Sequence, residues 1–227
     1  NLGWYDVPLA DELELAFGAG CPTMVDNDAH SAALAEVAHG ISSGAASSLY
    51  LTGTVGIGAG IIHDGKLLRG GSGFAGEVGH MPIGDPSAVC GCGRLGCWEA
   101  SIGLRGMLRG VGMAEEDTPV KTAAMVAARA ATDQGIRDAL EQLGRDLGTG
   151  LATLATVLNP EVIVLGGYFV PLGAYVVPAA SAVLAARLPS AAMHLPEIRL
   201  SSLGMHAAAL GAAEGALAGV YAGNLPA

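Results

Sequence analysis

Four side chains in this sequence have the types and the spacing of a metal-ligand set. His80 precedes Cys90 by ten residues, and Cys92 and Cys97 follow among glycines that allow a tight loop. One imidazole and three thiolates fill the tetrahedral shell of a zinc ion and leave no position for an activated water. The sequence therefore predicts a structural zinc site, against the alternative of a surface histidine beside three incidental thiols.

The cysteines also bear on the compartment. Three of the four lie within eight residues, which is typical of a metal site in a reducing compartment rather than of disulfides. We therefore expect a cytoplasmic protein. The sequence begins without Met and without a basic and apolar leader, so we expect that it starts inside a longer protein.

Charge and hydropathy argue against a DNA-binding segment and against a membrane-spanning protein. A net charge of −10 repels the DNA backbone, so this segment is not expected to bind DNA by itself. A hydrophobic content of 51% suits a packed core. The most apolar tract, residues 175–186, is short and contains Pro178, while His206 and Glu214 interrupt residues 205–222. We therefore expect no membrane span.

Helical and strand patterns alternate along the chain and must position the ligands. Asp28 is the expected N-cap of a helix over residues 29–38, which places Asn27 and Asp28 at its N-terminal end. The pair Asp64-Gly65 predicts a hairpin turn. Residues 74–98 are expected to form a long irregular loop within an α/β layout. Further strands are expected at 48–51, 57–62, 161–165 and 197–203, and further helices at 99–108, 120–131, 135–158, 175–187 and 206–218.

The sequence around the ligands resembles the zinc and sugar signature of the ROK family (repressors, open reading frames and sugar kinases). Residues 76–80 read Gly-Glu-Val-Gly-His, and residues 90–99 read Cys-Gly-Cys-Gly-Arg-Leu-Gly-Cys-Trp-Glu. Residues 25–29 (Val-Asp-Asn-Asp-Ala) and 159–167 (Asn-Pro-Glu-Val-Ile-Val-Leu-Gly-Gly) extend the match. The resemblance covers nearly the whole chain.

This resemblance implies the actin-like ATPase (ribonuclease H-like) fold. Residues 1–46 would form the C-terminal part of a first subdomain, and residues 47–227 a second subdomain with the zinc loop at about residues 76–99. The last helix would pack back on the first subdomain. Because family members are commonly dimers or tetramers, the resemblance also implies a homo-oligomer.

By the same resemblance, five polar residues hold the hydroxyls of a small sugar. Carboxylates accept hydrogen bonds from hydroxyls, and an amide can donate and accept. The histidine would bind zinc through one ring nitrogen and offer the other to the sugar. Taken singly, Glu77 could be a solvated loop residue and Glu99 a first-turn helix carboxylate. A phosphorylated ligand would need a basic partner, which none of these residues supplies. The five residues that would hold the sugar hydroxyls are Asn27, Asp28, Glu77, His80 and Glu99.

Two functions are compatible with the resemblance. Asp28 matches the family's catalytic base, which in the kinases takes the proton from the sugar hydroxyl that attacks the γ-phosphate of ATP; it could equally cap the helix and bind sugar without catalysis. Aligned with the kinases' Gly-Thr-Gly loop, this chain has Thr54-Val55-Gly56. Valine cannot donate a hydrogen bond to a phosphate oxygen, and its branched side chain crowds the backbone amides.

The regulator branch is the closer resemblance, on residues 49–58, residues 1–4 and Trp98. We therefore expect a sugar-sensing effector domain of a transcriptional regulator, in which sugar shifts the domain arrangement and so the DNA affinity. DNA would be bound only through a winged helix outside this chain. The alternative is an ATP-dependent, glucokinase-like sugar kinase with Asp28 as base.

Overall fold

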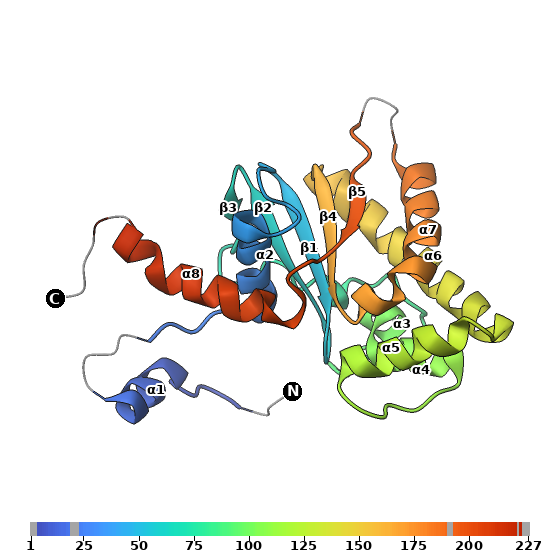
Figure 1. Cartoon of the computed structure of the whole chain (residues 1–227), viewed down its shortest axis with the longest axis horizontal. Coiled ribbons are helices and arrows are strands. Elements are labelled where there is room, and N and C mark those ends of the chain that lie inside the picture. Colours follow the sequence, from blue (N-terminus) through green and yellow to red (C-terminus); the bar gives the residue numbers. More distant parts are fainter. Residues whose placement is uncertain (1–3, 19–22, 190–192, 222, 224–227) are drawn as a thin grey trace.

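A mixed five-stranded sheet forms the centre of the protein (Figure 1). The computed structural model describes residues 4–18, 23–189, 193–221 and 223. The strand order is β3-β2-β1-β4-β5, with β4 parallel to β1 and β5 and with antiparallel pairs β1–β2 and β2–β3. This sheet confirms the predicted α/β class. The strands are β1 (Ser48–Gly53), β2 (Ile57–His63), β3 (Lys66–Leu67), β4 (Val162–Gly167) and β5 (Glu197–Leu200).

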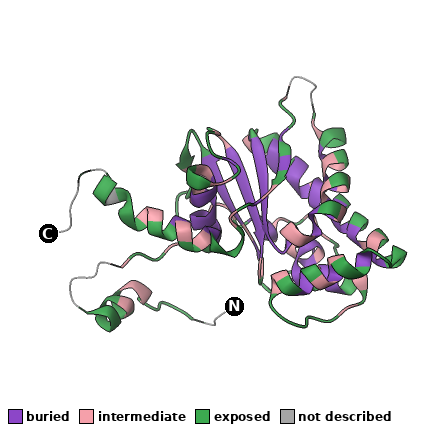
Figure 2. Cartoon of the chain, viewed as in Figure 1, coloured by how far each residue is buried: buried purple, intermediate pink, exposed green. Residues whose placement is uncertain are grey.

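Helices cover both faces of the sheet, and Figure 2 shows β1, β2 and β4 buried between them. Leu49 and Leu51 of β1 point into the larger core, formed with α6 and α7, whereas Tyr50 points into a smaller core formed with α2 and the start of α8. The helices are α1 (Leu9–Phe17), α2 (Asp28–His39), α3 (Trp98–Ile102), α4 (Leu104–Val111), α5 (Pro119–Ala130), α6 (Gln134–Leu158), α7 (Phe169–Arg187) and α8 (Ala207–Tyr221), with 3-10 turns η1 (Val78–His80) and η2 (Gly204–His206).

The helix α8 packs closely along α2 because one of its residues has no side chain. A Cβ on Gly211 would lie 1.7 Å from the carbonyl oxygen of Ser31. His39 Nε2 and Glu214 Oε1, 2.6 Å apart, add a polar link between the two helices. The last helix therefore braces the helix that begins at Asp28. The division into subdomains at residue 46 stays a prediction.

Trp98 anchors the first turn of α3 to α6. Its indole Nε1 donates to the carbonyl oxygen of Asp146 at 3.0 Å, and the ring is only 1% exposed. A Cβ on Gly150 would lie 2.2 Å from this ring. Because Cys97 and Glu99 flank Trp98 in the sequence, this contact fixes both on the hydrophobic core.

One helix among the described residues, α7, is long and apolar enough to cross a membrane. It packs against α6, α5 and β5 and buries Phe169, Leu172 and Val176, as a core helix of a folded domain does. The helix begins at Phe169, before the predicted start at residue 175, and it continues through Pro178 as the predicted helix does, so only the predicted start was wrong. Proline removes one N–H from the helix, which this packing tolerates.

Several predicted boundaries are also corrected. The N-cap of α2 is Asn27, whose Oδ1 accepts from the backbone N–H groups of Ala29 and His30, and not Asp28. The single helix predicted at 99–108 is two helices, because Gly103 is extended between α3 and α4. The predicted strand 197–203 ends at Leu200, and α1 was not predicted. The hairpin turn is confirmed, since Asp64 and Gly65 both have positive φ.

We predict that Gly150→Ala lowers the free energy of unfolding by about 1 to 3 kcal/mol, because the new methyl group overlaps the Trp98 ring. The control is Gly110→Ala in α4, where a Cβ would meet only Ala139 at an ordinary 3.9 Å. Helix propensity alone should leave that control unchanged or stabilise it by up to about 1 kcal/mol. Urea unfolding measures both variants, and equal stability of the two would refute the anchoring role of Trp98.

Candidate functional site

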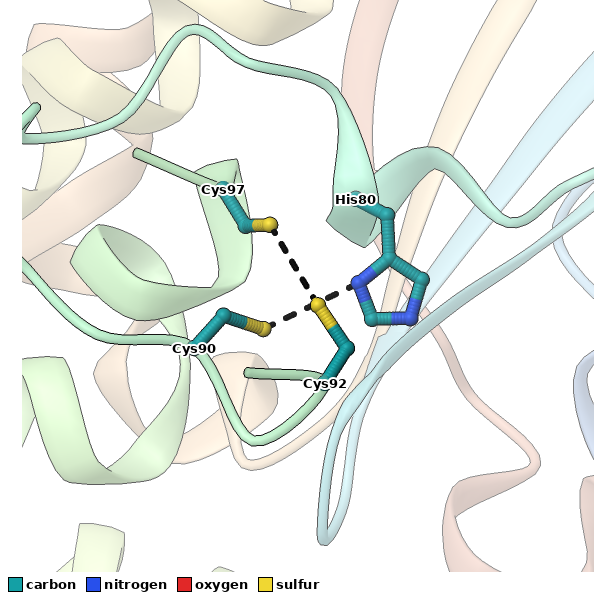
Figure 3. A group of neighbouring side chains, drawn as sticks. All are labelled: His80, Cys90, Cys92 and Cys97. Carbon is teal, nitrogen blue, oxygen red and sulfur yellow. Dashed lines mark hydrogen bonds between the residues drawn. The ribbon is translucent and has the colours of Figure 1, made fainter. Parts of the chain in front are cut away.

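The four predicted metal ligands converge on one point (Figure 3). His80 ends η1, Cys90 and Cys92 lie in the irregular loop, and Cys97 directly precedes α3. Their ligand atoms all lie within 4.8 Å of one another. The distance is 3.7 Å from Cys92 Sγ to Cys97 Sγ and also from Cys90 Sγ to His80 Nδ1.

These separations fit a tetrahedral metal ion. A metal–sulfur distance of about 2.3 Å places tetrahedral ligands about 3.8 Å apart. All three thiols are free, and 3.7 Å is far beyond the length of a disulfide bond. The donor set and its geometry could therefore hold one ion such as zinc.

Different surroundings give the thiols of Cys90 and Cys92 different acidities. Arg94 Nε donates to Cys92 Sγ at 3.5 Å and lowers the pKa of this exposed thiol to about 6. Burial raises the pKa of Cys90 to about 12. Cys92 can thus offer a thiolate at neutral pH, whereas Cys90 needs a bound cation to lose its proton.

A cleft of about 490 Å³ opens beside this cluster. It brings together residues from α2, from the turn between β1 and β2, from the segment before η1 and from the first turn of α3. Thr52 and Thr54 also line it and were not predicted. All five residues predicted to hold a sugar are in its wall, namely Asn27, Asp28, Glu77, His80 and Glu99.

Glu99 connects the wall of the cleft to the cysteine cluster. Its Oε2 accepts from the backbone N–H of Ile57 at 2.8 Å, and the Cys90 thiol donates to Oε1 at 3.5 Å. Gly56 permits this approach, since a Cβ there would lie 2.7 Å from Oε2. His80 has a similar double position. Its Nδ1 faces Cys90, and its Nε2 lies 3.8 Å from Glu77 Oε2.

A polar group that the sequence reasoning missed holds the N-terminus of α2. Arg69 donates from both terminal nitrogens to the two carboxylate oxygens of Asp26 at 2.7 Å, and Asp26 accepts from the backbone N–H of Asn27 at 2.8 Å. His30 Nε2 lies 2.7 Å from the carbonyl oxygen of Ala75. The Arg69 hydrogen bonds lower the pKa of Asp26. No pattern in the sequence predicts the Asp26–Arg69 pair, because 43 residues separate the two side chains.

A second cavity, of about 470 Å³, lies at the opposite end of the strands from the cleft, where β4 and β5 begin. Ser42, Glu161 and Arg199 are among its lining residues. It contains none of the residues predicted to bind metal or sugar.

The chain belongs to the ROK family, whose model matches residues 1–218. Solved structures support the same assignment. A ROK family glucokinase from Streptomyces griseus, solved with glucose and AMPPNP, superposes with a TM-score of 0.80 at 29% identity, over 94% of this chain and 73% of that chain. A ROK family transcriptional regulator, a homologue of the E. coli MLC protein, gives 0.77 at 29% identity, over 90% and 54%. These neighbours confirm the predicted actin-like ATPase fold.

Curated relatives include both kinases and repressors. The glucokinase of Halalkalibacterium halodurans is 39% identical over 181 residues, which are 74% of this chain and 54% of that protein. The xylose repressor of Caldicellulosiruptor bescii is 33% identical over 181 residues, 73% of this chain and 44% of that protein. The chain therefore spans about half the length of the curated relatives it matches.

We predict that Arg69→Met lowers the free energy of unfolding at pH 7 by at most about 1 kcal/mol, because Arg69 is half exposed and solvent screens the pair. Asp26 has a lowered pKa, so its pairing stabilises the fold above the ordinary pKa of 3.8 and is lost as pH falls through the lower folded pKa. The difference between wild type and variant should therefore be constant well above pH 3.8 and shrink as the pH falls below it. Denaturant unfolding from pH 7 to pH 3 measures it, with Arg187→Met as control; a difference independent of pH would contradict the pairing.

Proposed function

We propose that this chain is the sugar-binding effector region of a ROK transcriptional regulator, built around one structural zinc ion. The zinc ligands would be His80, Cys90, Cys92 and Cys97. The observation that carries the proposal is that all five polar residues matched to the family's sugar site line one cleft beside this ligand cluster. Zinc would order the loop that contributes His80, Gly91 and Cys92 to the lining of the cleft.

The polar groups of the cleft are suited to sugar hydroxyls. The N-cap hydrogen bonds occupy Asn27 Oδ1, which leaves its amide nitrogen to donate. The backbone N–H of Ile57 holds Glu99 as a fixed acceptor. With metal on Nδ1, the His80 ring would carry its proton on Nε2 and donate toward the cleft. A hydroxylated ring thus finds donors and acceptors on several sides.

A sugar kinase is the second candidate, supported by Asp28 in the cleft and by the glucokinase relatives. The loop between β1 and β2 argues against it. Val55 is 71% exposed in this loop, and its side chain has no donor group, while the backbone N–H of Thr54 donates to the carbonyl oxygen of Gly56 within the loop at 3.1 Å. Phosphoryl transfer depends chiefly on hydrogen-bond donors that are positioned to hold the phosphate groups of ATP. We therefore favour the regulator.

The proposed regulator acts in the cytoplasm as a homo-oligomer. DNA would be contacted through a winged helix that precedes this chain, because the chain itself carries a net charge of −10. Sugar in the cleft would shift the balance between domain arrangements and thereby change DNA affinity.

We predict one zinc per chain by elemental analysis, and a lower melting temperature and weaker sugar binding for Cys92→Ser, because metal binding and loop folding share one free energy. A chelator should lower the melting temperature of the wild type toward that of the variant and leave the variant unchanged. Metal-free protein that melts and binds sugar like the zinc-loaded form would refute the zinc site.

For the complete protein we predict a sugar-dependent change in DNA affinity that needs no nucleotide, and no sugar phosphorylation. DNA binding is measured by fluorescence anisotropy with a panel of hexoses and pentoses, and ATP consumption by a coupled assay. ADP release that depends on sugar at about 1 to 100 per second would overturn the regulator in favour of the kinase. Glu99→Gln keeps the shape of the side chain but weakens the acceptor. In this variant the change in DNA affinity should need an about ten-fold higher sugar concentration.

A further inference from the structure

A smaller cavity of about 220 Å³ adjoins the cleft on the far side of Glu99. The two share Val55, Gly91 and Glu99 as lining residues, so they meet along the rim formed by the β1–β2 turn and the cysteine loop. Unlike the cleft, this cavity is lined by two basic side chains, Arg105 and Arg109.

The two arginines lie on one side of α4, four residues apart. One terminal nitrogen of Arg109 donates to the carbonyl oxygen of Ala100 at 2.6 Å, which holds this guanidinium beside α3. Arg105 is exposed and has no hydrogen bond or ion pair within the part of the chain that the structure describes. No carboxylate among the described residues forms an ion pair with either one. Two guanidinium groups thus line one cavity.

An arginine pair of this kind is suited to a phosphate or a carboxylate, which accepts several hydrogen bonds from planar guanidinium groups. Resting on the proposed sugar function, we propose that Arg105 and Arg109 form an anion subsite, and that the natural ligand is a sugar derivative carrying a phosphate monoester or a carboxylate. The sugar ring occupies the cleft, and the anionic group passes Glu99 to reach the arginines.

The sequence offered no sign of this subsite, because neither arginine belongs to the motifs that carry the family resemblance. The break at Gly103 sets the direction of α4 and brings its arginines next to the cysteine loop. The basic partner that the predicted sugar residues lack is therefore supplied by the following helix.

The test is calorimetry on the zinc-loaded protein with glucose, mannose, xylose and N-acetylglucosamine, each compared with its phosphate monoesters and its sugar acid. The variants are Arg105→Gln, which breaks no contact in the described structure, and Arg105→Gln with Arg109→Lys, which keeps a donor for Ala100. Arg187→Gln is the control, since it removes an equal charge at the far end of α7. Melting temperatures verify that each variant is folded.

We expect one anionic derivative to bind at least about ten-fold more tightly than its neutral parent, with an advantage that falls as salt is added. Arg105→Gln should remove most of that advantage and change neutral sugar binding less than two-fold, and the control should keep it. Comparison of ester and acid identifies the anion. The subsite is overturned if no anionic derivative of the panel binds better than its neutral parent, or if the advantage survives in both variants.

A separate titration distinguishes this inference from the proposed function. If neither sugars nor their derivatives bind, the proposed sugar function is wrong. A titration with inorganic phosphate then tests the subsite alone, through NMR shifts of the backbone amides of residues 104–109. If phosphate shifts these amide signals and Arg105→Gln abolishes the shifts, the arginines form an anion site that does not depend on sugar binding. Phosphate without effect on these amides would overturn the subsite as well.

Discussion

The site depends on one constraint: the loop before α3 must be ordered with hardly any hydrophobic burial. Between residues 80 and 96 only Cys90 and Gly96 are buried. The convergence of one imidazole and three thiols replaces the missing core, with short backbone bonds such as Cys90 N–H to Arg94 oxygen. A metal ion at this point would supply the folding free energy that apolar contacts cannot provide.

The same constraint ties the cleft to the interior of the domain. Trp98 is packed against α6, and its sequence neighbours are a cluster thiol on one side and a cleft carboxylate on the other. That carboxylate, Glu99, reaches the backbone of Ile57 in the β1–β2 turn. Core, cluster, cleft and arginine cavity therefore share one short stretch of chain, so a disturbance of the cluster is expected to reach ligand binding.

The sequence predicted what depends on local pattern. Strand patterns at residues 48–51 and 57–62 identified β1 and β2, the Asp64-Gly65 turn identified the hairpin of β2 and β3, and closely spaced cysteines identified the cluster. Contacts between distant segments were not predictable, because nothing local encodes the pairing of Asp26 with Arg69. The first six residues of α7, from Phe169, were missed for a related reason, since packing against α5 and α6 stabilises them although they include Pro171 and Gly173.

We propose that a sugar binds between the N-terminus of α2 and the histidine–cysteine cluster. A crystal structure of the zinc-loaded protein with the sugar that most raises its melting temperature tests this directly. We expect sugar density in hydrogen-bond contact with Asn27, Asp28 and Glu99, beside a tetrahedral metal peak. Sugar bound instead in the cavity near Ser42 and Arg199, with the cleft empty, would contradict it.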